Sequence, residues 1–148
     1  MRAVIQRVKK AAVTVENEKI AAIQQGFLVF VGVEEEDTEE DAEYIARKIS
    51  AMRIFSDSDE KMNLALQDVK GSVLSVSQFT LHAETKKGNR PSFAKAARPE
   101  KAQSLYEYFN ENIREKGILV QTGVFGAMMD IELINDGPVT ILMDSKNK

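Results

Sequence analysis

Hydrophobic and polar residues alternate along the first part of the chain in the way that β-strands require. A strand is predicted for Ala3–Val8. A hairpin is then predicted to join Val13–Val15 to Ile20–Ile23, with Asn17 and Glu18 in the turn. The chain therefore begins as a β-rich protein.

The next segment, Gly26–Val33, is apolar almost throughout, short and rich in β-branched residues. Such a run is typical of a central strand that is covered on both faces. In the segment Ala127–Ile134, alternate residues are apolar, which predicts one buried face and one mostly wet face. The other strands predicted in the second half are Ser72–Leu81, Ile118–Gly123 and Pro138–Asp144.

Two amphipathic helices separate these strands. Asp37 or Thr38 can cap the first helix, with acidic residues three positions on, as in a capping box. Pro99 marks the first turn of the second helix and Gly117 offers a residue that ends it. The apolar stripes predicted to face the sheet are Ala42, Ile45, Ala46, Ile49 and Met52 in the first helix, and Ala102, Leu105, Tyr106, Phe109 and Ile113 in the second.

The predicted fold class is α/β. At 148 residues, with no internal repeat and no linker, the chain is most simply one domain, residues 1–148. The order of elements predicts a mixed sheet system with both helices on one side. No window approaches the roughly 18 consecutive apolar residues of a membrane span, and the N-terminus does not resemble a cleaved signal. We therefore expect a cytoplasmic protein with no membrane partner.

Composition removes several kinds of chemistry. The absence of cysteine excludes disulfides, thiolate nucleophiles and cysteine-ligated zinc, and one histidine cannot form a two-histidine metal site. The segment that begins at Asp57 lacks the oxygen ligands and the glycine of a calcium loop, so a polar loop is expected there. No glycine-rich nucleotide loop is present. We expect neither a metal nor a cofactor.

The single histidine, His82, is a weak catalytic candidate. In a strand, its five-residue offset from Ser77 places the two side chains on opposite faces, which excludes a Ser-His pair. Thr80 and His82 would share a face, so a Thr-His dyad is conceivable. A partly exposed histidine at the end of a strand is the simpler interpretation.

Charge is unevenly distributed. Eight of the ten residues from Glu34 to Glu43 are acidic, which is typical of a helix start. The stretch from Glu84 to Lys101 is basic instead, and such a run is either a solvated surface or a phosphate contact. Its basic residues are Lys86, Lys87, Arg90, Lys95, Arg98 and Lys101.

Two separated motifs are specific together. "SQFTL" at Ser77–Leu81 is followed by "KGNRPSF", and "NDGPVT" at Asn135–Thr140 is preceded by "TGVFGAMM". With these motifs the chain resembles the D-aminoacyl-tRNA deacylases, which hydrolyse D-amino acids from mischarged tRNA. The resemblance covers essentially the whole chain. It implies a homodimer of β-β-α layered subunits with a pocket at the subunit interface.

The resemblance also implies roles for particular residues. Ser77, Gln78, Phe79 and Thr80 would line the pocket that takes the terminal aminoacyl-adenosine. Gly137 and Pro138 would form a cis peptide that enters the neighbouring subunit's pocket, where main-chain carbonyls reject L-amino acids. Glycine has no side chain, so glycyl-tRNA should partly escape this rejection. The residues that match the family's pocket or its supporting shell are Phe125, Met129 and Arg7.

The chemistry of the implied substrate fits these residue types. An aminoacyl ester is labile, so placement and stabilisation of the developing oxyanion are the main requirements. Backbone N–H groups at the end of the Ser77–Thr80 segment are candidate donors. Water assisted by the substrate's 2′-hydroxyl and Thr80 as a covalent nucleophile both remain open. Gln78 suits an adenine edge or a ribose hydroxyl, whereas Phe79 suits either the core or base stacking.

The partner implied is the aminoacylated 3′ end of tRNA, with no DNA partner. Lys86, Lys87 and Arg90 would contact tRNA phosphates without reading bases. Two alternatives remain: an editing domain of the same fold that removes a wrong L-amino acid, and an RNA-binding module without catalysis.

Overall fold

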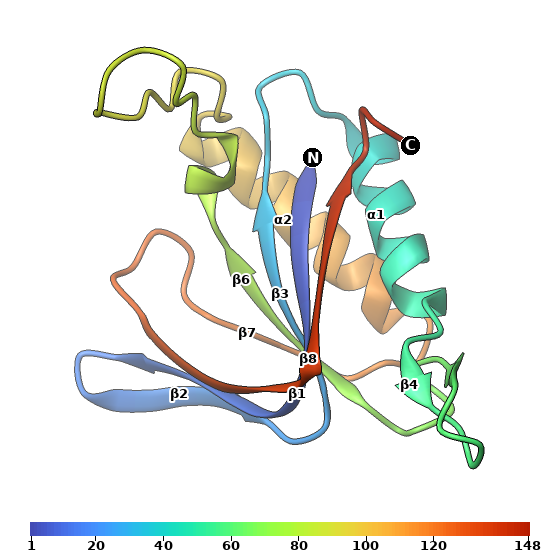
Figure 1. Ribbon diagram of the computed structural model, residues 1–148. Coiled ribbons are helices and arrows are strands. Elements are labelled where there is room, and N and C mark those ends of the chain that lie inside the picture. Colours follow the sequence, from blue (N-terminus) through green and yellow to red (C-terminus); the bar gives the residue numbers. More distant parts are fainter.

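A bent β-sheet system forms the body of the molecule, and two helices cover one of its faces (Figure 1). The computed structural model describes residues 1–148. The strands of the main sheet run in the order β2-β1-β3-β6-β7, and β8 pairs with β1. Their bounds are β1 (Arg2–Val15), β2 (Glu18–Ile23), β3 (Gly26–Gly32), β6 (Ser72–Ser77), β7 (Val120–Thr122) and β8 (Asp130–Asp144). A small separate hairpin pairs β4 (Phe55–Ser56) with β5 (Met62–Leu64).

Strand β1 belongs to two layers. Its first half, Arg2–Val8, pairs with β3, whereas Ala11–Val15 pairs with β2. Strand β8 follows β1 through both halves, and the register of this pair shifts between Gln6 and Lys10. Because an irregular register bends a strand, β1 and β8 leave the main sheet together and form a second layer with β2 (Figure 1). The predicted α/β fold class, mostly sheet with two helices, is confirmed.

The side chains of β3 show how the layers pack. Phe27, Val29 and Val31 belong to the large cluster under the helices, whereas Leu28 belongs to a smaller cluster between the two β layers. Strand β6 runs parallel to β3, as expected where both faces are covered. The prediction of a central buried strand is therefore confirmed.

Both predicted helices are present on the same side of the main sheet (Figure 1). Helix α1 (Glu39–Ala51) begins after Thr38, whose backbone N–H donates to the carboxylate of Asp41 at 2.8 Å. Helix α2 (Pro99–Arg114) has Pro99 as its first residue. Every residue of the two predicted apolar stripes is buried, except that Met52 is only partly buried.

Several strand predictions were wrong in their boundaries. The hairpin turn consists of Glu16 and Asn17, both with positive φ, so Glu18 already belongs to β2. Strand β1 continues beyond Val8, because β8 supplies its partner there.

The strands predicted at Ala127–Ile134 and Pro138–Asp144 are parts of one strand, β8. From Ala127 to Ile134 partly buried side chains alternate with exposed ones, so the predicted alternation is present, but its inner face is only partly buried. Gln6 pairs with Thr140 and Val8 pairs with Asn135, so residues 136–139 bulge out opposite Arg7 alone.

Neither helix has the length and apolarity that a membrane span requires.

Candidate active site

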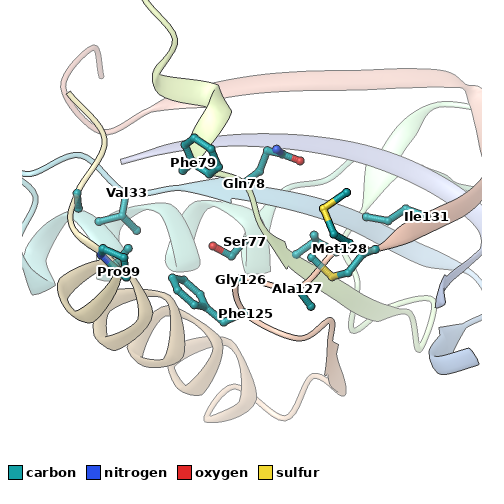
Figure 2. Close-up of a pocket in the computed structure, with 14 residues that line it drawn as sticks. Val33, Ser77, Gln78, Phe79, Pro99, Phe125, Gly126, Ala127, Met128 and Ile131 are labelled. Carbon is teal, nitrogen blue, oxygen red and sulfur yellow. The ribbon is translucent and has the colours of Figure 1, made fainter. Parts of the chain in front are cut away.

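A cavity of about 630 Å³ opens between the two β layers and helix α2 (Figure 2). The end of β6 forms one wall, the start of α2 forms a second, and the segment before β8 forms a third. Ten of the fourteen lining residues are hydrophobic, so the cavity is an apolar pocket with a short polar edge. The lining residues are Val33, Val76, Ser77, Gln78, Phe79, Ala97, Pro99, Ala102, Phe125, Gly126, Ala127, Met128, Met129 and Ile131.

The polar edge is the stretch in which β6 ends. The last pair between β3 and β6 is Val31 with Ser77, and the Gln78 N–H donates to the Val31 carbonyl at 2.8 Å. The Gln78 side-chain amide donates to the Thr80 hydroxyl at 2.5 Å. Ser77 and Gln78 line the cavity, whereas Thr80 is exposed beside it. Gln78 therefore links the pocket to the Thr80 hydroxyl.

The prediction that the strand runs on to Leu81 was wrong. The chain turns into a short 3-10 helix, η1 (Phe79–His82), because β3 offers no further pairing partner beyond Ser77. Because the chain turns here, Phe79 and His82 do not lie where a continued strand would have placed them. The ring of Phe79 is 55% exposed and not part of the core, and His82 is buried rather than partly exposed.

The Thr-His dyad that the sequence left conceivable does not form. His82 packs inward beneath η1, against Gly32, and its Nε2 has no hydrogen-bond partner. It does not line the cavity. A buried imidazole without contact to Thr80 does not act as its general base.

None of the lining side chains is ionisable. A titratable group behind the wall is Tyr106, whose ring lies 6.1 Å from that of Phe125. Burial raises the pKa of Tyr106, and its hydroxyl donates to the Ser75 carbonyl at 2.7 Å. Tyr106 therefore ties α2 to β6 as a neutral group. The cavity itself presents no side-chain acid, base or cation.

Two further predicted residues, Phe125 and Met129, line the cavity with Ser77, Gln78 and Phe79. Gly137, Pro138 and Arg7 do not. They meet instead at the bulge in β8, where Gly137 and Pro138 are exposed and their peptide bond is cis, as the resemblance implied.

The Arg7 side chain contacts this bulge and links it to Ile54. Its Nε lies 3.3 Å from both the Asp136 carbonyl and the Asp136 carboxylate, and its Nη1 donates to the Ile54 carbonyl at 2.6 Å. Asn135 donates to the carbonyls of Arg7 and Val139, both at 3.0 Å. A nearly buried arginine and one amide thus hold an exposed main-chain turn in place.

The predicted phosphate-binding residues lie in the loop that follows η1 (Phe79–His82). Lys86, Lys87 and Arg90 are exposed and form no ion pair. The loop is closed at its base by two hydrogen bonds between Glu84 and Ser92, of 2.8 and 3.0 Å. The three free cations are therefore available to an anionic partner.

Comparison with known proteins gives the family. The sequence profile described as D-Tyr-tRNA(Tyr) deacylase matches residues 4–144. The chain belongs to this family. A D-aminoacyl-tRNA deacylase of Bacillus pumilus is 62% identical over 146 residues, covering 99% of each chain. A protein of the same name from Thermus aquaticus is 58% identical over 148 residues, covering 100% of this chain and 97% of the relative.

Solved structures agree with the fold. A structure named c-Myc DNA unwinding element binding protein superposes with a TM-score of 0.91 at 42% identity, covering 97% of this chain and 98% of the other. A probable eukaryotic D-amino acid tRNA deacylase superposes with a TM-score of 0.82 over 96% and 97% of the two chains, at 17% identity. The second likeness shows the shared fold alone.

Sequence reasoning missed most of the apolar wall. Val33, Pro99, Ala102 and Ile131 line the cavity but look like ordinary core or helix residues in the sequence. Met128 carries a signal, since it is a large apolar residue on the wet face of an alternating segment, and it is 92% exposed. An apolar residue at a predicted polar position is the kind of exception that marks a binding surface.

Proposed function

We propose that this chain hydrolyses the ester bond of D-aminoacyl-tRNA and releases a free D-amino acid and tRNA. Membership of the deacylase family supports this activity, and so do the names of the full-length relatives. The apolar cavity beside Ser77 and Gln78 has the size of a small-ligand site. Aminoacyl-adenosine, with one amino acid and one nucleoside, matches that description.

The observation that carries the mechanism is the absence of ionisable side chains from the cavity. A labile ester does not need a strong base when water and carbonyl are held in place and the oxyanion is stabilised. We infer that water attacks the carbonyl carbon, assisted by the 2′-hydroxyl of the substrate. The bond between the carbonyl carbon and the ribose oxygen breaks, and the ribose oxygen leaves with a proton.

Two protein groups are candidates for oxyanion stabilisation. The first hydrogen bond of η1 runs from the Leu81 N–H to the Gln78 carbonyl. The N–H groups of Phe79 and Thr80 therefore lie outside the helix's own hydrogen bonds, at the edge of the cavity. Thr80 as a covalent nucleophile is the alternative, and it would have to act without a base from the cavity.

The proposed source of chiral selection is the turn at Gly137 and Pro138. It is exposed, lies outside the cavity of its own chain, and is held by Arg7 and Asn135. In a homodimer, such a turn is suited to enter the partner's cavity and complete it. Fixed carbonyl oxygens there would exclude the L side chain by position and tolerate glycine, so glycyl-tRNA is an expected second substrate.

The tRNA body would be held by charge. Lys86, Lys87 and Arg90 are free to contact phosphates next to the cavity. Phosphate contacts position a nucleic acid and carry no direct sequence information. Recognition is therefore expected to be general for tRNA.

Incubation of the pure protein with D-Tyr-tRNA and L-Tyr-tRNA tests the function. Loss of the D-ester alone supports the proposal. Loss of the L-ester would indicate an editing domain for a wrong L-amino acid. Loss of neither, with tRNA still bound, would indicate an RNA-binding module without catalysis.

A further inference from the structure

Two aromatic rings stand side by side at the mouth of the cavity. Phe79 and Phe93 have ring centroids 5.2 Å apart and planes at 76°, an edge-to-face pair. Phe79 is 55% exposed and Phe93 is 37% exposed. Phe79 lines the cavity and Phe93 does not. The pair therefore extends an aromatic surface from the cavity outward.

The same stretch of chain carries the free cations. Phe93 directly follows Ser92, which closes the base of the loop with Glu84. Lys86, Lys87 and Arg90 occupy this loop and form no ion pair. An apolar partner surface would gain nothing from three solvated cations, whereas a nucleic acid strand would. Exposed aromatic rings beside a cationic path are the features that bind single-stranded nucleic acid, with bases on the rings and phosphates on the cations.

We propose that Phe93, together with Phe79, forms a stacking subsite for an unpaired base on the 5′ side of the terminal nucleoside. This inference rests on the proposed function, since the cavity must hold the terminal aminoacyl-adenosine for the next base to reach Phe93. The subsite reads the presence of a base rather than its identity, because every base has a π-face. Phe93 would act in binding and not in the chemical step.

The experiment compares two substrates that differ only beyond the terminal nucleoside. D-Tyr-tRNA has the neighbouring nucleotides and D-Tyr-adenosine lacks them. Base stacking lost on replacement by alanine corresponds to about 5- to 150-fold in affinity. Phe93→Ala is expected to raise KM for D-Tyr-tRNA by this factor, with kcat unchanged, and to leave hydrolysis of D-Tyr-adenosine unchanged.

Two matched variants separate stacking from packing. Phe93→Leu keeps apolar contact with Phe79 but has no ring, so it is expected to behave like Phe93→Ala. Phe93→Trp keeps an aromatic face and is expected to restore the KM for D-Tyr-tRNA. Phe93 is not part of the core, so the variants are expected to unfold at the wild-type temperature.

Three results would overturn the inference while leaving the deacylase function intact. These are an unchanged KM for D-Tyr-tRNA in Phe93→Ala, an equal loss on both substrates, and a wild-type KM in Phe93→Leu. Equal loss would mean that Phe93 only supports Phe79. If the wild-type protein left D-Tyr-tRNA intact, the proposed function would fail first and the subsite with it.

Discussion

In the proposed mechanism Thr80 assists hydrolysis and does not carry it alone. Its hydroxyl accepts a hydrogen bond from the Gln78 side chain, and no titratable group of the chain's own cavity is available to remove its proton. The substrate's 2′-hydroxyl lies next to the ester in every aminoacyl-tRNA. We therefore propose that the substrate, rather than the protein, activates the water.

Thr80→Ala tests this division of labour. Loss of one hydrogen-bonding partner costs about 1 kcal/mol, so kcat is expected to fall by about tenfold or less. Single-turnover hydrolysis of D-Tyr-tRNA measures the effect, with Thr80→Ser as the control that keeps the hydroxyl. A loss of more than about a thousandfold, or a trapped acyl-enzyme in the wild type, would identify Thr80 as the nucleophile.

The complementary change is made in the substrate. A D-aminoacyl-tRNA that ends in 2′-deoxyadenosine lacks the assisting hydroxyl. Its hydrolysis by the wild-type protein is expected to be about 10²- to 10⁴-fold slower, the usual contribution of acid-base assistance. An unchanged rate, measured against the normal ester under single turnover, would exclude substrate assistance.

Glycine at position 32 lets η1 approach β3 closely. A Cβ on Gly32 would lie 3.0 Å from the Gln78 carbonyl oxygen, the His82 Cδ2 and the Leu81 Cβ. Arg2 holds the same turn from the other side, since its Nη1 donates to the Leu81 carbonyl at 2.8 Å. The 3-10 helix that carries Phe79 and Thr80 therefore packs directly against the backbone of β3 at Gly32.

Gly32→Ala is expected to displace η1 by a few tenths of an ångström. Because catalysis by placement is sensitive to small shifts, kcat should fall by about tenfold or more. Binding of uncharged tRNA should be unchanged, since the basic loop is untouched. Ser58→Ala is a suitable control, because Ser58 is exposed, lies outside the cavity and is not part of the basic loop. Full activity in Gly32→Ala would show that close packing of η1 against β3 is not required for catalysis.

The basic loop that carries Lys86, Lys87 and Arg90 predicts that tRNA binding depends on salt concentration. Replacement of Lys86, Lys87 and Arg90 by alanine should weaken tRNA binding and lower the slope of log Kd against log salt concentration by about two to three. Filter binding at several salt concentrations measures this slope. A control that removes the same charge elsewhere is the exposed set Arg53, Lys61 and Lys116. Equal slopes for both triple variants would mean that the loop makes no specific phosphate contact.

The whole molecule presents a cavity on one face and a braced main-chain turn that lies outside it. A single chain leaves both features exposed, which is the arrangement expected of two halves of a composite site. We therefore expect the protein in solution to have about twice the 16.5 kDa mass of one chain. A monomer that still rejects L-aminoacyl-tRNA, as judged by light scattering and hydrolysis together, would contradict the composite site.

Gly137→Ala tests the proposed gate. Gly137 has a φ of +119°, and an added Cβ would lie 2.8 Å from the Arg7 Nη2 and 2.9 Å from the Val139 Cγ2. The turn must then move, so hydrolysis of L-Tyr-tRNA is expected to rise by about tenfold, or about 1.4 kcal/mol in selectivity. D-Tyr-tRNA hydrolysis serves as the internal control. An unchanged ratio of the D and L rates would remove the turn from chiral selection.

Local sequence patterns were enough for several features. The two helices, their buried stripes and the Pro99 start follow from spacing along one segment, and so does the alternation from Ala127 to Ile134. The motifs around Ser77 and Gly137 were also visible, because short runs of unusual residues need no folding to be noticed. Each of these signals lies within a few consecutive turns or strand residues.

Contacts between distant segments settled the rest. Strand β6 ends at Ser77 because β3 offers no further partner, and this exposes Phe79 and buries His82. Strand β8 runs through the bulge because β1 and Asn135 supply its hydrogen bonds. The apolar cavity wall exists only where β6, α2 and the start of β8 meet. Periodicity records which face of a segment is buried, but where a strand stops and what it faces depends on partners far along the chain.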